Sequence, residues 1–166
     1  MEKVLCQLIS LLDQQIAMIK HLINLAAQKT DILVSTSADK IGDIIYEEQE
    51  AQLELERVEK RRLALVDEIA VLSGFSDKNA SLSEVIAQAD EPFASELNGK
   101  RSELQKQLDD YKERSEINTA LIASNLNYVD YMIHAIMDQK APSAIYGSKG
   151  YMQQEDGARR FFDNKV

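Results

Sequence analysis

The sequence contains few of the residues that interrupt helices or cross-link chains. Its 166 residues include two prolines, six glycines, one cysteine and no tryptophan. Because proline and glycine are the residues least tolerated inside helices, their scarcity favours long uninterrupted ones. The lone Cys6 excludes an intramolecular disulfide. Its place in an apolar helical segment predicts a buried or half-buried side chain in a reducing cytosol.

Excess positive charge and long apolar runs are also missing. A net charge of -9 repels phosphate backbones, so we expect no nucleic-acid partner. No stretch approaches the roughly 20 apolar residues that span a bilayer. The apolar segment from Val4 to Leu12 is interrupted by Gln7 and Ser10, and no small-residue cleavage site follows it. We therefore expect a cytoplasmic protein without a membrane span.

Residue patterns typical of catalysis or metal binding are absent from the sequence. His21 and His134 lie on different predicted helices, without a second ligand at metal-binding spacing. The glutamates within 47–56 lack the Glu-x-x-His pairs of carboxylate di-metal bundles. No Ser/His/Asp or Cys/His arrangement can be argued from the chain. We expect neither an enzyme nor a bound metal or cofactor.

Apolar residues recurring at three- and four-residue steps predict an all-α fold. The second long helix carries an unbroken heptad series, in which only Glu48 and Arg62 are charged. These two side chains should lie at a bundle edge, reach out to solvent along their aliphatic stems, or find partners across the seam. Ser81 and Glu84 have the spacing of a capping box in the connector. The expected helices are about 3–33, 39–73, 82–90 and 93–139.

These elements predict an elongated antiparallel three-helix bundle or coiled coil over residues 1–139, with a short connector helix. The same contacts could also be made between chains, so a homo-oligomer remains open. The segment 117–137 of the third long helix is apolar on several faces. More of its circumference must therefore be covered than a bundle edge requires.

Residues 140–166 are expected to form a flexible tail that binds a partner. Pro142 stops the helix, and three glycines follow it. Large apolar side chains nevertheless persist, and basic residues outnumber acidic ones. Such a segment is typical of peptide-recognition elements that become ordered on binding. The candidate contact residues of the tail are Ile145, Tyr146, Gly147, Tyr151, Phe161 and Phe162.

The carboxy-terminal part of the chain contains Asn118-Thr-Ala-Leu-Ile, then Asn125 one heptad later, and Tyr146-Gly147-Ser148-Lys149-Gly150 after a proline. In these residues it resembles the FlgN family of flagellar export chaperones. The second helix, with Glu59-Lys60-Arg61-Arg62-Leu63, is also similar, so the resemblance covers nearly the whole length.

The resemblance implies a cytosolic chaperone that binds the amphipathic ends of hook-associated proteins and docks at the flagellar export gate. It places Asn118, Leu121, Ile122 and Asn125 in the cargo-binding region, together with Tyr146 and Gly147. We extend the cargo-binding candidates along the adjoining apolar surface. This extension adds Val129, Met132, Ile133 and Ile136.

The candidate contact residues also have simpler structural interpretations. Asn118 and Asn125 could fix helix register, as buried asparagines do in coiled coils. Tyr146-Gly147 could be a turn, and Phe161 and Phe162 could fold back onto the bundle. The alternative function is a structural coiled-coil protein that self-associates and has no client.

Overall fold

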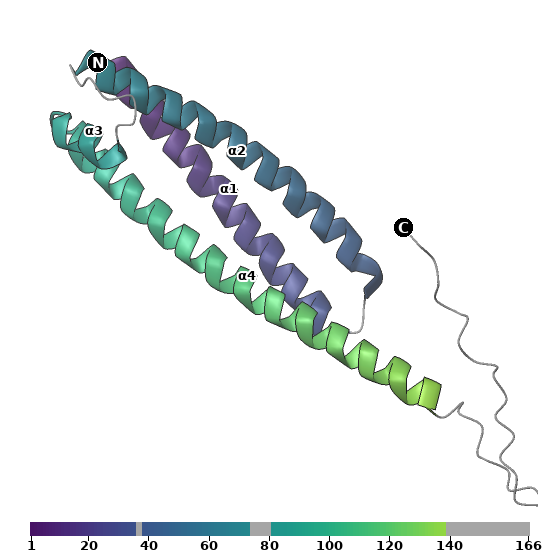
Figure 1. Ribbon diagram of the computed structural model, residues 1–166. Coiled ribbons are helices and arrows are strands. Elements are labelled where there is room, and N and C mark those ends of the chain that lie inside the picture. Colours follow the sequence, from purple (N-terminus) through teal and green to yellow (C-terminus); the bar gives the residue numbers. More distant parts are fainter. Residues whose placement is uncertain (36–37, 74–80, 139–166) are drawn as a thin grey trace, which may run out of the picture. The chain divides into compact units, whose positions relative to one another are not determined.

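The structure is a computed structural model that describes residues 1–35, 38–73 and 81–138 (Figure 1). All regular structure in these ranges is helical, which confirms the all-α prediction. None of the described helices is long and apolar enough to cross a membrane. The elements are α1 (Glu2–Val34), the 3-10 turn η1 (Ala38–Lys40), α2 (Ile41–Leu72), α3 (Leu82–Gln88) and α4 (Phe93–Asp138).

The chain divides into two compact units, Met1–Leu126 and the part from Asn127 onward, of which residues 127–138 are described. The first unit holds α1, α2, α3 and most of α4. Polar contacts give the direction of its helices. Gln15 pairs with Glu59 and Lys29 pairs with Glu48, so α1 and α2 run antiparallel.

Contacts between α1 and α4 rise together in residue number, so these two helices run parallel. Lys20 Nζ lies 2.7 Å from a carboxylate oxygen of Glu103, and Asn125 Nδ2 donates to the carbonyl of Leu33 at 3.1 Å. The amide of Gln52 on α2 also donates to the hydroxyl of Tyr111 on α4 at 3.0 Å. Both α2 and α4 therefore contact α1 and each other.

Burial is greatest on α1, because its leucines and isoleucines recur at steps that fill one broad face. That face includes Ile9, Leu22 and Leu25, which are all buried. All four helices contribute to one apolar cluster near the start of α1. Its buried members are Leu5, Leu8, Ile9, Leu12, Val66, Ile69, Val85 and Leu97.

The connector helix α3 is held at its start by the predicted capping box. The hydroxyl of Ser81 accepts from the backbone N–H of Glu84, and the Glu84 carboxylate accepts from the backbone N–H of Ser81 at 2.6 Å. This arrangement satisfies N–H groups that a helix start leaves unpaired. The cap lets α3 present Val85 to the apolar cluster.

The burial prediction for Cys6 is wrong, since its side chain is exposed. Cys6 follows the buried Leu5 by one residue, about 100° around the helix, and so falls off the buried face. Leu72 is also exposed although it continues the heptad series, because it is the last residue of α2. Of the charged seam residues, Glu48 has a partner across the seam in Lys29 of α1, whereas Arg62 pairs with Glu59 on α2 itself.

Candidate functional site

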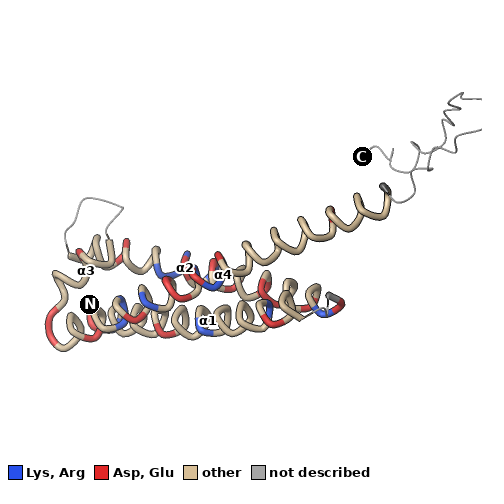
Figure 2. Tube along the Cα trace, turned by 90° about the horizontal axis from the view of Figure 1, so that it is seen from below, with Lys and Arg blue, Asp and Glu red and all other residues tan. Residues whose placement is uncertain are grey.

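The second half of α4 combines exposed apolar side chains with very little charge. Between Ile117 and Met137 the sequence contains a single charged residue, Asp130. In Figure 2 this end of α4 is a tan tube, whereas the helices of the first unit carry many red and blue segments. The exposed large apolar residues of this stretch are Ile117, Ile122, Leu126, Tyr128, Val129, Tyr131, Met132, Ile133, Ile136 and Met137.

Two rows of residues at seven-residue steps run along this part of α4. One row is Asn118, Asn125 and Met132, and the other is Ile122, Val129 and Ile136. In a helix such rows are neighbouring stripes of a coiled-coil seam. Of the other predicted positions, Leu121 of the first unit is half-buried and Ile133 of the second unit is exposed.

Within the first unit, the asparagine row of α4 is held against α1 by side-chain hydrogen bonds. Asn118 is only 1% exposed, and its Nδ2 donates to the carbonyl of Ala26 at 2.8 Å. The hydroxyl of Thr30 donates to Oδ1 of Asn118 at 2.7 Å. One heptad later, Asn125 Nδ2 donates to Leu33, whose carbonyl lies one residue before the end of α1 at Val34.

In the second unit, the four predicted positions of α4 all expose their side chains. Val129, Met132, Ile133 and Ile136 follow one another at steps that place them on one side of a helix. Each would normally bury its side chain in a water-soluble bundle. Four such residues on one side form an apolar surface that a partner helix could cover.

Two residues important to this region were not predicted from the sequence. Thr30 donates a hydrogen bond to Asn118, and its only sequence signal was a hydroxyl near the end of an amphipathic helix. Leu126 is exposed beside Asn125 and was not among the predicted contacts.

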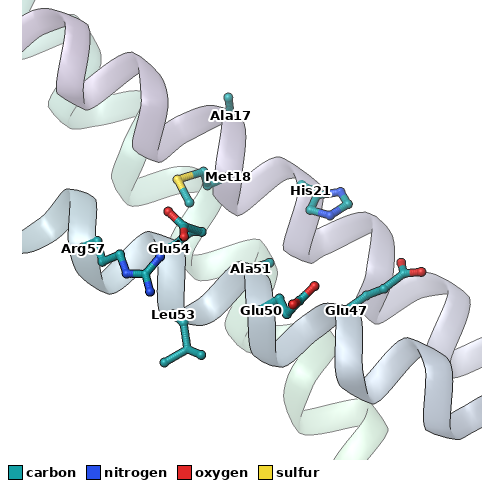
Figure 3. Close-up of a pocket in the computed structure, with 9 residues that line it drawn as sticks. All are labelled: Ala17, Met18, His21, Glu47, Glu50, Ala51, Leu53, Glu54 and Arg57. Atoms are coloured by element: carbon teal, nitrogen blue, oxygen red, sulfur yellow. Dashed lines mark hydrogen bonds and ion pairs between the residues drawn. The ribbon is translucent and has the colours of Figure 1, made fainter.

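A separate groove lies on the first unit between α1 and α2. It encloses about 690 Å³ and is lined by residues of both helices (Figure 3). Its rim is acidic, with Glu47, Glu50 and Glu54, and Arg57 pairs with Glu54. In the part of the chain that the structure describes, no group of three His, Cys, Asp or Glu side chains could hold a metal ion. The remaining lining residues are Ala17, Met18, His21, Ala51 and Leu53.

The tail positions proposed as partner contacts lie outside the described residues. These are Ile145, Tyr146, Gly147, Tyr151, Phe161 and Phe162. The structural evidence for a site therefore comes from α4.

Comparison with protein families gives a match that covers nearly the whole chain. The family model described as FlgN protein matches residues 1–154. The chain belongs to the FlgN family. This is a family of flagellar export chaperones and not of enzymes, so membership confirms the general role that the resemblance implied. No curated protein and no solved structure matches the chain.

The exposed side chains of α4 between Ile117 and Met137 indicate which kind of partner suits this FlgN protein. They offer apolar contact area and, apart from Asp130, no charged group. Such a surface suits an amphipathic helix, which recognises a groove or face through apolar side chains at three- and four-residue steps.

Proposed function

We propose that this FlgN protein is a cytosolic chaperone that binds the amphipathic ends of hook-associated proteins and delivers them to the flagellar export gate. The client helix packs on Ile122, Val129, Met132, Ile133 and Ile136. Leu121, Asn118 and Asn125 border that surface. In this proposal the whole chain acts as an elongated antiparallel three-helix bundle with a partner-binding tail.

One observation carries the proposal: the heptad series of α4 continues past Asn125, and its apolar residues there are exposed. A heptad series is the pattern of a helix that packs against another helix. Val129 and Ile136 repeat the seam position of Ile122. A client helix laid along them would complete the seam.

Burial of apolar area drives the association, at about 25 cal/mol per Å² removed from water. An unpaired amphipathic helix of a client would otherwise associate with other clients. Covering its apolar stripe prevents that association until export. Release stays possible because binding must also offset the entropy of ordering flexible segments, which limits the affinity.

The tail residues are proposed to contact the client or the export gate. The tail carries five Lys or Arg and three Asp or Glu, whereas the whole chain has a net charge of -9. Its large apolar side chains and positive charge suit a partner with an apolar pocket and acidic surroundings.

The experiment compares two valine-to-aspartate variants in a pull-down of a hook-associated protein. Val129 on α4 is 50% exposed and Val71 on α2 is 65% exposed, so neither change disturbs a buried side chain. Val129→Asp should abolish recovery of the client, and Val71→Asp should preserve it. Equal recovery by both variants would contradict the proposed surface.

A structural protein that only self-associates is separated by sedimentation. That function predicts stable higher oligomers through the same apolar face. The chaperone instead predicts a monomer or small oligomer that forms a defined complex with its client. Self-association would be favoured if Val129→Asp dissociates the oligomers and neither the parent protein nor the variant binds a client.

A further inference from the structure

We infer that Asn118 and Asn125 are positioning residues, which fix the register of α4 on α1 and thereby set which apolar side chains of α4 are presented. Both asparagines make the same type of hydrogen bond, from the side-chain amide to a backbone carbonyl of α1. Asn118 donates to Ala26 at 2.8 Å and Asn125 donates to Leu33 at 3.1 Å. Both pairs are 92 residues apart, so the same contact occurs twice, one heptad apart, on parallel helices.

Apolar packing alone specifies this register weakly. Leu97 is the buried apolar residue that α4 contributes to the core cluster, and Phe93 and Leu104 pack partly against it. Beyond Leu104 the seam continues with the exposed Leu108. Among the described residues of α4, only Leu97 and Asn118 are buried; Leu121 in the second half is half-buried, so the directional bonds of Asn118 fix that half more strictly than its apolar contacts do.

Both polar atoms of the Asn118 side chain have a hydrogen-bond partner on α1. Its Nδ2 has an acceptor at Ala26 and its Oδ1 has a donor at Thr30. A slip of α4 by one turn would leave these buried polar groups without partners, which is costly in an apolar interior. A buried asparagine specifies register in coiled coils by the same physics, at some cost in stability.

The buried position also separates this role from client contact. A side chain that is 1% exposed cannot reach a client while α4 lies on α1. The effect on client binding rests on the proposed function and acts through the neighbouring row. Holding Asn118 and Asn125 toward α1 leaves Ile122 and Leu126 exposed beside them.

The register can be measured without any client, by distances between two spin labels. Labels at Gln7→Cys on α1 and Ala120→Cys on α4 occupy exposed positions. Because Asn118 lies level with Ala26, Ala120 lies level with Gln28, which is 21 residues beyond Gln7 on α1. At about 1.5 Å per residue, the two labels are therefore about 30 Å apart along the helix axis. Cys6→Ser is required in every sample, because Cys6 is exposed and would also take a label.

The test variant is Asn118→Leu with Asn125→Leu, and the matched control is Asn98→Leu, an exposed asparagine of the same helix. The control should keep one narrow distance. The test variant should gain a second distance shifted by about 5 Å, one helical turn. Its melting temperature should not fall, because leucine replaces a buried polar group at position 118 and position 125 is exposed. A single unchanged distance in the test variant would overturn the inference.

Thr30→Val keeps the test decisive if the leucine variant does not fold. It removes the hydroxyl that lies within hydrogen-bond distance of both Asn118 Oδ1 and the carbonyl of Ala26, and it lies on α1 outside the proposed client surface. A register role predicts a broader distance distribution and weaker client binding in Thr30→Val. Direct client contact by Asn118 predicts unchanged distances and unchanged binding. If the parent protein binds no client, the proposed function fails, while the distances still decide the register.

Discussion

Lys29 of α1 and Glu48 of α2 form an ion pair whose side chains are only 12% and 10% exposed. The pair lies toward the end of α1, away from the apolar cluster around Leu8 and Leu12. Two charges removed from water are tolerated because each satisfies the other. This pair therefore links α1 and α2 one turn beyond the buried Leu25 of α1 and Ile44 of α2.

Removal of one partner should destabilise the protein strongly. Glu48→Leu leaves Lys29 buried without a carboxylate, which typically costs about 3–5 kcal/mol. The double variant Lys29→Met/Glu48→Leu should recover most of that loss, since an apolar pair can replace a buried ion pair. Urea denaturation of both variants measures the free energies of unfolding. A double variant as unstable as the single one would contradict this account.

Acid should destabilise the contact between α1 and α2 through Glu59. Arg62 donates two hydrogen bonds to the Glu59 carboxylate and lowers its pKa; partial burial opposes the shift, and the Gln15 amide adds to it. A depressed pKa in the folded state contributes stability above the ordinary value of about 4.3 and loses it as pH falls further. Glu59→Gln should therefore flatten the fall in melting temperature below that pH. An unchanged acid profile in the variant would show that Glu59 contributes nothing.

Leu97 joins α4 to the apolar cluster, and its side chain is fully buried. Leu97→Ala should lower the free energy of unfolding by about 2–5 kcal/mol, because a cavity remains where the side chain was. Leu72→Ala is the matched control, since Leu72 is exposed at the end of α2. Equal losses in the two variants, measured by urea denaturation, would mean that Leu97 does not anchor α4.

Deletion of residues 140–166 should separate stability from binding. The apolar cluster and the contacts among α1, α2 and α4 are made by residues before 140. Helicity and melting temperature should therefore stay nearly unchanged, while recovery of the client or the export gate falls. A large drop in melting temperature, followed by circular dichroism, would place the tail in the core.

The helices were predictable because local periodicity determines them, and the three- and four-residue steps of α1 and α2 are unambiguous. Exposure on α4 was harder to predict. Leu108 continues the heptad series yet is exposed, because a series records which face can pack and not whether a partner is present. The roles of Asn118 and Asn125 stayed open for a similar reason. Their bonds run to backbone carbonyls of α1, and a backbone carbonyl leaves no mark in a sequence.

The most direct test of the central claim is the affinity of a hook-associated protein for Val129→Asp and Val71→Asp, measured by titration calorimetry. A charge placed on the client-binding face must be desolvated on binding, whereas a charge on α2 stays in water. The account predicts at least a tenfold loss of affinity for Val129→Asp, about 1.4 kcal/mol or more, and parent affinity for Val71→Asp. Parent affinity in both variants would contradict it.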